Sequence, residues 1–188
     1  MKKLNPEFYA RDAEEVAKDL LGNYLVREIN GKILKGKIVE TEAYYGYKDP
    51  ASRAYKGKTN LSEGMWSKPG TIFIYNVHNH WMLNFVTGKE NEAQAVLIRA
   101  LEPIEGVDLM KQYRCKDKLK DLCSGPGKLT RAFKITKEEF HGNLANLDLV
   151  IIRSKEIKNI ETSHRIGVTR DLPKHLRFFI KNNEFVSK

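Results

Sequence analysis

The chain has 188 residues, of which 41% are hydrophobic, and this composition excludes an intrinsically disordered protein. Its 33 Lys and Arg residues exceed its 24 Asp and Glu residues, so the formal net charge at pH 7 is +9. Such a charge favours a polyanionic partner, above all nucleic acid, although a solvated basic face gives the same total.

The cysteines and the apolar segments exclude several further classes of protein. Cys115 and Cys123 are too few for a disulfide scaffold, lack the C-x-x-C spacing, and have no histidines near them in sequence to complete a zinc site. We therefore expect reduced thiols, no metal and a cytoplasmic location, associated with the nucleoid in a prokaryote. Charges interrupt the N-terminal segment and no apolar run approaches the length of a membrane span. We expect neither a signal peptide nor a membrane partner.

The N-terminal part of the chain predicts helix and then a β-hairpin. Pro6 suits the first turn of a helix, and a second helix is expected over residues 12–21, where Gly22 ends it. Two strand-like segments follow, 24–29 and 33–44, and Asn30-Gly31 between them is a strong signal for a two-residue turn.

The remainder of the chain alternates strand-like and helical segments. A polar loop is expected over residues 46–70, and loops of this length in compact domains are usually functional or disordered. Strands are predicted over 71–77, 81–87, 95–101, 149–153 and 176–180, a helix over 105–113, and a solvated charge run over 115–123. SGPGKL has the character of a helix N-terminus, where backbone N–H groups can hold a phosphate. These elements predict an α+β fold with a mainly antiparallel sheet, in one domain over residues 1–188.

Several blocks, in this order, resemble the 3-methyladenine (alkyladenine) DNA glycosylase family. They are VETEAY, the segment DPAS, KPGTIFIY, an asparagine in the next strand, LIRALEPIEG, CSGPGKL, RIGV and LRFFI. The resemblance covers most of the chain and implies a single compact domain with a curved antiparallel sheet flanked by helices. It also implies a monomeric enzyme without metal or cofactor, which flips a damaged purine out of double-stranded DNA and hydrolyses its N-glycosidic bond.

This implied chemistry agrees with the residue types present. A base inside a duplex has to be extruded before its sugar carbon can be attacked. A pocket for it needs aromatic rings to replace lost stacking, a general base for water, and a basic rim for phosphates. No motif contains a lysine suited to Schiff-base chemistry, so we predict a glycosylase without lyase activity. The lesions considered are alkylated purines, hypoxanthine and ethenoadenine.

The resemblance assigns the catalytic pair to Glu42 and Arg99. Glu42 matches the family residue that deprotonates the attacking water, and Arg99 matches the arginine that helps to hold this water. An arginine within an apolar strand needs a partner, and a buried Glu42 would be one. Glu40 shares the strand face of Glu42, so it is a candidate for support but is assigned no catalytic role. Composition alone would favour a solvated glutamate at position 42.

The resemblance also assigns a base pocket. Tyr44 and Tyr75 match the rings that stack on the two faces of the flipped base, although each could instead be a core tyrosine. Asn84 matches the side chain that crowds the exocyclic amine of guanine, or it is simply a residue at a strand end. Val168 corresponds to a pocket position whose backbone contacts the site.

Two departures from the family pattern lie on loops expected to face DNA. Arg53 stands where the family has a pocket histidine. Its charge would repel a cationic alkylpurine and favour neutral lesions such as hypoxanthine, or its side chain could instead turn outwards to a phosphate. His78 stands in place of the tyrosine wedge that fills the gap left by the flipped base. His80 or an exposed Met65 could instead fill part of this gap.

Contacts with the DNA backbone are predicted for a further group of residues: Met65, Lys68, Ser124, Gly125, Lys128 and Arg165. Two alternatives to an enzyme remain open from the sequence. One is a family member that binds nucleic acid but has lost turnover through Arg53 and the altered wedge. The other is a basic RNA-binding domain, which would have no need of the Glu42–Arg99 pair.

Overall fold

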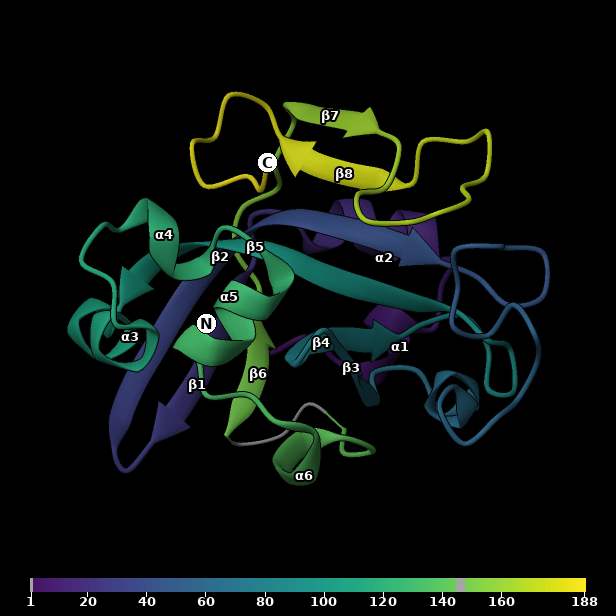
Figure 1. The fold of residues 1–188 in the computed structure, drawn as a ribbon, viewed down its shortest axis with the longest axis horizontal. Coiled ribbons are helices and arrows are strands. Elements are labelled where there is room, and N and C mark those ends of the chain that lie inside the picture. Colours follow the sequence, from purple (N-terminus) through teal and green to yellow (C-terminus); the bar gives the residue numbers. More distant parts are fainter. Residues whose placement is uncertain (1, 145–147) are drawn as a thin grey trace.

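A curled antiparallel sheet forms the centre of the computed structural model, which describes residues 2–144 and 148–188 (Figure 1). Within these residues the strand order is β3-β4-β5-β2-β1-β6. β8 pairs with β2 past the part of β2 that pairs with β1, and β7 pairs with β8. The strands are β1 (Tyr24–Ile29), β2 (Lys32–Tyr44), β3 (Ile72–Val77), β4 (His80–Val86), β5 (Ala95–Glu105), β6 (Leu149–Ile152), β7 (Ile160–Ser163) and β8 (Arg177–Ile180). The predicted α+β class and the curved, mainly antiparallel sheet are confirmed.

β2 is the strand around which the site is built. It pairs with β5 along most of its length, with β1 over its first half and with β8 over Glu40 to Glu42. The register of β2 on β5 shifts on both sides of Glu40. Such bulges bend a strand and redirect its side chains. Here they lie where Glu40, Glu42 and Arg99 of β5 have to meet.

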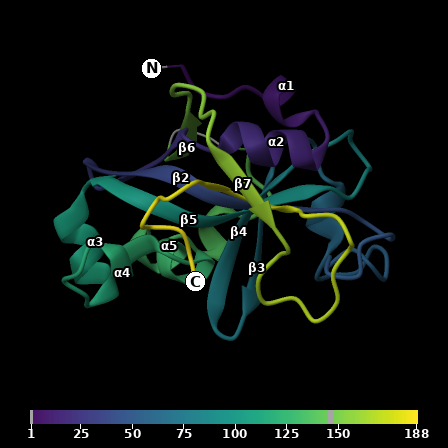
Figure 2. The same cartoon turned by 90° about the horizontal axis from the view of Figure 1, so that it is seen from above.

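The two N-terminal helices, α1 (Pro6–Tyr9) and α2 (Ala13–Leu20), begin as the sequence predicts. Pro6 is at the start of α1, and the Asp12 side chain caps α2 by accepting from the Glu14 N–H. α2 buries Ala13, Val16, Ala17 and Leu20 at helical spacing and packs on β2 and β5. Figure 2 shows both helices on one side of the sheet and the β3–β4 hairpin on the other.

Two hairpins have the two-residue turns that antiparallel strands favour. Asn30 and Gly31 join β1 to β2, and His78 and Asn79 join β3 to β4, all four with positive φ. Positive φ at both central positions is the type I′ geometry, whose twist matches that of the strands. The first turn confirms the prediction, and the second places His78 at a hairpin tip.

Four further helices flank the sheet: α3 (Val107–Arg114), α4 (Lys120–Cys123), α5 (Pro126–Ala132) and α6 (Lys137–Phe140). α5 packs on β4 and β5, and Gly127 makes the close approach possible, because a Cβ there would lie 2.7 Å from the His80 side chain. The charge run at 115–123 contains α4, with Cys115 exposed and Cys123 buried, and neither is in a disulfide.

The long loop between β2 and β3 is packed against the domain. It contains a short 3-10 helix, η1 (Glu63–Trp66), and buries Asp49, Ala54, Ser62 and Met65. The expectation of a surface loop is therefore only partly right. Among the residues that the structure describes, no helix is long and apolar enough to cross a membrane.

Candidate active site

Glu42, near the end of β2, has no exposed surface and is held by three donors. The Ile166 N–H donates to its Oε1 at 2.8 Å, while the Tyr44 hydroxyl and Nη1 of Arg99 donate to its Oε2 at 2.7 and 3.2 Å. A carboxylate oxygen can accept two hydrogen bonds. Oε1 therefore keeps one acceptor position, next to Ile166.

Burial raises the pKa of Glu42 above its ordinary value, although Arg99, the Ile166 N–H and the Tyr44 hydroxyl act in the opposite direction. A raised pKa is what a carboxylate needs in order to accept a proton near neutral pH. The nearby donors keep the charged form accessible. The environment of Glu42 is thus suited to a general base.

Arg99, on β5, bridges two carboxylates. It is 6% exposed, and it donates from Nε to Glu40 Oε1 at 3.0 Å and from Nη1 to Glu42 Oε2. Burial acts to lower its pKa, but Glu42 and Glu40 outweigh this, so the pKa of Arg99 is raised. Arg99 therefore stays cationic, and the partner that the sequence required for it is Glu42 together with Glu40.

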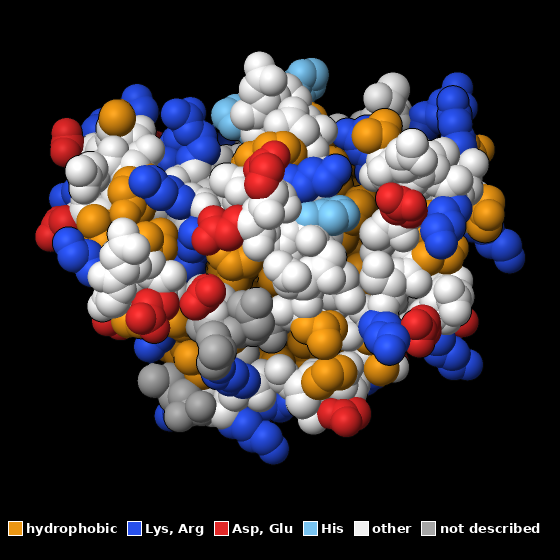
Figure 3. All heavy atoms as spheres, turned by 90° about the horizontal axis from the view of Figure 1, so that it is seen from below, with side chains coloured by type: hydrophobic (Ala, Val, Ile, Leu, Met, Phe, Trp, Pro, Cys, Tyr) orange, Lys and Arg blue, Asp and Glu red, His pale blue; other side chains and the backbone are white. Residues whose placement is uncertain are grey.

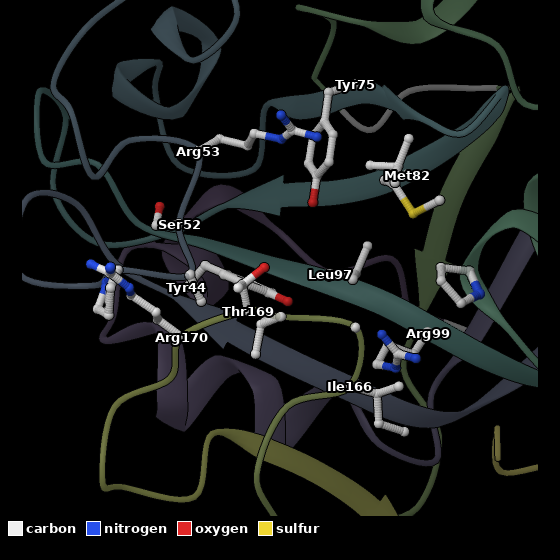
Figure 4. Close-up of a pocket in the computed structure, with 16 residues that line it drawn as sticks. Tyr44, Ser52, Arg53, Tyr75, Met82, Leu97, Arg99, Ile166, Thr169 and Arg170 are labelled. Atoms are coloured by element: carbon white, nitrogen blue, oxygen red, sulfur yellow. The ribbon is translucent and has the colours of Figure 1, made fainter.

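A cavity of about 510 Å³ opens beside Arg99, and we call it the base pocket (Figure 4). This volume lies in the usual range for small-molecule sites. Tyr75 and Arg53 lie on one side of it, and Tyr44, Thr169 and Arg170 lie on the other. Glu42 is not in the wall of the pocket; it lies behind Tyr44 and Arg99, which are.

Each of the two tyrosines has a guanidinium group over its ring. Arg165 lies 4.5 Å from the centroid of Tyr44, and Arg53 lies 4.7 Å from that of Tyr75. Burial raises the pKa of Tyr75 to about 12, against the effect of Arg53. Both phenols therefore stay protonated at neutral pH. Because a guanidinium lies over one face of each ring, a planar ligand would stack on the other face.

The charge of the base pocket is positive. Arg53, Arg99 and Arg170 line it, and no acidic side chain of the described residues is in its wall. Val168 is a lining residue as well, between Gly167 and Thr169. The structure thus brings Tyr44, Arg53, Tyr75, Arg99 and Val168, all predicted from the sequence, to one cavity.

Asn84 differs from the other predicted pocket residues. It is 2% exposed and is not part of the pocket wall. Its Nδ2 donates to the carbonyls of Phe73 and Met82, at 3.1 and 3.0 Å. In this position the side chain links β4 to β3.

A second cavity, of about 930 Å³, adjoins the base pocket and shares Val77, Met82, Arg99 and Pro126 with it. We call it the basic groove, because Asp121 is its one acidic lining residue among those described. Its basic lining residues are Arg99, Arg114, Lys116, Lys118, Lys120, Lys128, Arg131 and Lys188. Ser124, Gly125 and His78 also line it.

The basic groove is a local feature of the surface. On the face seen in Figure 3, Lys and Arg side chains are spread over the surface, with Asp and Glu side chains among them. The sequence interpretation missed the groove, since it treated residues 115–123 as a solvated charge run. The sequence feature that could have revealed the groove is the lysine at every second position, 116, 118 and 120, shortly before CSGPGKL.

Two predicted DNA contacts are wrong, because the side chains are buried. Met65 is 2% exposed and packs within the loop, with its sulfur 3.8 Å from Ser52 Oγ. The Arg165 side chain has no exposed surface and forms ion pairs with Asp49 and Asp171, at 2.7 and 2.6 Å. Arg165 therefore anchors the loop before β3 and cannot reach a phosphate. Lys68 is exposed but is not in the wall of the basic groove.

No group of three or more His, Cys, Asp or Glu side chains within residues 2–144 and 148–188 is arranged to hold a metal ion.

Comparison with known proteins gives one consistent result. The sequence model of the methylpurine-DNA glycosylase (MPG) family matches residues 7–184. A protein of Carboxydothermus hydrogenoformans is 46% identical over 188 residues, covering 97% of both chains. Proteins of Francisella tularensis and Clostridium botulinum are 44% and 42% identical, covering 93% and 98% of both chains. All three bear the name "Putative 3-methyladenine DNA glycosylase".

Proposed function

Because the chain belongs to the methylpurine-DNA glycosylase family, we propose that it excises damaged purines from double-stranded DNA as a monomeric, monofunctional enzyme of base excision repair. It hydrolyses the N-glycosidic bond and leaves free base and an abasic site. The observation that supports this most strongly is the buried Glu42–Arg99 pair directly behind an aromatic pocket. A module that only binds nucleic acid has no use for a buried carboxylate with a raised pKa.

In this proposal Glu42 activates the attacking water. The water would take the open acceptor position on Oε1, the oxygen that also accepts from the N–H of Ile166, a residue in the wall of the base pocket. Glu42 accepts the proton of this water as it attacks the sugar C1′. Its charge also stabilises the positive charge that develops on the sugar ring. Arg99 keeps Glu42 ionised and oriented.

The base pocket receives the extruded purine. Flipping costs a few kcal/mol, and the cost is lowest for damaged or mispaired bases. Stacking on Tyr44 and Tyr75 recovers roughly 1–3 kcal/mol per base. Val168 and its neighbours close the side of the pocket next to Ile166.

The hairpin tip and the basic groove hold the DNA around the flipped nucleotide. His78 is exposed at the tip of the β3–β4 hairpin, where an aromatic ring can fill the space that the base leaves. The basic groove, including Ser124, Gly125 and Lys128, runs from the base pocket past this hairpin. Its lysines and arginines are suited to phosphate contacts.

One assay tests the proposed function. The protein is incubated with duplexes that each carry a single hypoxanthine, ethenoadenine or 7-methylguanine, and half of each sample is then treated with alkali. We expect cleavage at the lesion after alkali and no cleavage without it. If no lesion gave alkali-labile sites with the protein in excess over DNA, the proposed glycosylase activity would be refuted.

Replacing Arg53 with His is expected to shift the relative single-turnover rates towards cationic lesions, so that 7-methylguanine gains on hypoxanthine by about tenfold. Arg53 puts a guanidinium beside the stacking ring Tyr75, and like charges raise the energy of a bound cationic base. Competition between the two lesions in one reaction measures the ratio. The control is Arg153→His, an exposed position outside the base pocket, and equal ratios in all three proteins would remove the charge argument.

Replacing both Lys116 and Lys118 with Ala is expected to weaken DNA binding equally for damaged and undamaged duplexes. Each phosphate contact adds about 0.9 to the slope of log affinity against log salt, so the slope falls by roughly 1.8. Fluorescence anisotropy at several salt concentrations gives the slope. Lys32→Ala, at the exposed first residue of β2 and outside the wall of the groove, is the matched control. An unchanged slope in the double variant would mean that DNA does not follow the groove.

A further inference from the structure

Glu40 is a buried carboxylate that the proposed mechanism does not use. It has no exposed surface, yet it accepts hydrogen bonds from three separate parts of the chain. Its Oε1 accepts from Arg99 Nε at 3.0 Å and from Arg177 Nε of β8 at 2.7 Å. The third part is the C-terminal segment, residues 183–188. There Ser187 donates to Glu40 twice, from Oγ at 2.9 Å and from its N–H at 2.7 Å.

Ser187 contacts both arginines as well. Arg99 Nη2 donates to Ser187 Oγ at 3.3 Å, and Arg177 Nη2 donates to the Ser187 carbonyl at 3.2 Å. All the polar groups of Ser187 are thus engaged with Glu40, Arg99 and Arg177, and the residue is only 8% exposed. A serine held in this way belongs to the interior of the site.

Apolar packing seats the segment in this position. Phe185 is 7% exposed and packs on Val39 and Ala100. These two residues are the chain neighbours of Glu40 and Arg99, at the bulges between β2 and β5. Figure 2 shows the end of the chain passing over β5 towards β4 and α5. The segment thereby reaches the basic groove, whose wall includes Val186, Ser187 and Lys188.

The contacts of Arg99 show what the segment does. Three of its donors point at three partners: Nε at Glu40, Nη1 at Glu42 and Nη2 at Ser187. The remaining surface of Arg99 lines both the base pocket and the basic groove. Without its bonds to Glu40 and Ser187, the guanidinium would be held by Glu42 alone. Glu40 and Ser187 therefore restrict its position against Glu42.

We propose that Ser187 is a positioning residue of the active site, which acts through Glu40 and Arg99 to hold the guanidinium against Glu42. This inference rests on the proposed function, since it assigns a role within the same reaction. It makes turnover depend on a residue 145 positions away from Glu42 in the chain, in a segment that no catalytic motif contains. Ser187 lies in the wall of the basic groove, but all its polar groups are engaged with Glu40, Arg99 and Arg177, so we expect it to make no polar contact with DNA.

The test is Ser187→Ala, compared with Ser187→Thr and with the matched control Ser154→Ala, whose serine lies away from both cavities. For Ser187→Ala we expect a fall of about tenfold in the single-turnover rate at saturating enzyme, because small misplacements of catalytic groups are costly. The dissociation constant for lesion DNA should change less than twofold. Ser187→Thr keeps the hydroxyl and should restore most of the rate.

The pH profile provides a second readout. The groups around Glu42 are Arg99 of β5, Glu40 and Tyr44 of β2, Tyr75 of β3, Arg177 of β8 and the Ile166 N–H of the loop before β8. Arg165 of the same loop acts on Tyr44, over whose ring it lies. Arg99 acts to lower the pKa of Glu42, so a looser Arg99 lets that pKa rise. Activity requires ionised Glu42, and the acid limb of the Ser187→Ala profile should therefore lie at higher pH than that of the wild type.

The outcomes separate this inference from the proposed function. A Ser187→Ala rate and acid limb equal to those of the wild type would overturn the positioning role while leaving the glycosylase intact. A lower rate that accompanies a lower melting temperature, with no change of the acid limb and no rescue by Thr, would also overturn it. An inactive wild type would refute the proposed function itself, and the inference with it.

Discussion

Glu42→Gln is expected to reduce the single-turnover rate of base excision by about 10²–10⁴-fold, the usual contribution of a general base. Glutamine keeps the shape of the side chain and can still accept from the Ile166 N–H, but it cannot take the proton of the attacking water. It also removes the negative charge that would stabilise the sugar cation. The affinity for lesion DNA should stay within about threefold, since Glu42 is not in the wall of the base pocket.

This prediction is measured with enzyme in excess over a duplex that carries one lesion, and anisotropy on the same duplex gives the affinity. Glu28→Gln, an exposed glutamate on β1, is the matched control and should behave as the wild type. The wild-type rate should also decline on acidification at a pH above the ordinary range of a glutamate, because burial raises the pKa of Glu42. A Glu42→Gln enzyme with more than a tenth of the wild-type rate would exclude Glu42 as the base.

Arg165→Met is expected to have the largest effect on stability, with a loss of about 3–5 kcal/mol, the typical result of breaking a buried ion pair. The Arg165 guanidinium donates to both oxygens of Asp49 at 2.7 Å and to Asp171 at 2.9 and 2.6 Å. Without it, Asp49 is left as a buried charge with no cation. For a chain of this size the melting temperature should fall by roughly 6–20 °C.

Thermal unfolding followed by circular dichroism measures this loss, and Arg153→Met, at an exposed arginine, is the control. The direction in which this stabilisation changes with pH follows from the pKa of Asp171. Partial burial acts to raise its pKa, but hydrogen bonds from Arg165 outweigh this and hold the pKa below the ordinary value. The stabilisation is therefore complete above the ordinary aspartate range, near 4, and is lost as the pH falls below it. A fall of less than 2 °C in Arg165→Met would contradict the structural role of this pair.

Sequence patterns were sufficient where the physical cause is local. Asp12 caps α2 and Asn30-Gly31 makes the first turn, because a side-chain acceptor and positive φ angles are properties of the residues themselves. β7 was not predicted, because four partly exposed residues of mixed polarity carry little periodic signal.

Only those site residues that lie in recognisable sequence motifs could be predicted. Tyr44, Tyr75 and Arg99 stand in recognisable blocks, and the structure brings them to one cavity. Arg165 stands in such a block too, but nothing in RIGV shows that its partners are Asp49 and Asp171. The contacts of Ser187 arise because strands distant in the chain meet at the bulges of β2. Pairings of this kind depend on tertiary structure, so a basic residue read by itself is easily mistaken for a phosphate contact.

The most direct test of the central claim is to measure free base released from a lesion-bearing duplex by the wild type and by Glu42→Gln, at equal occupancy of the DNA. Mass spectrometry identifies the base, and borohydride added to a parallel reaction traps any covalent enzyme–DNA adduct. We predict stoichiometric release of the damaged purine by the wild type, an intact strand with an abasic site, almost no release by Glu42→Gln, and no trapped adduct. Equal release by both proteins, or a trapped adduct with the wild type, would contradict hydrolysis by a water that Glu42 activates.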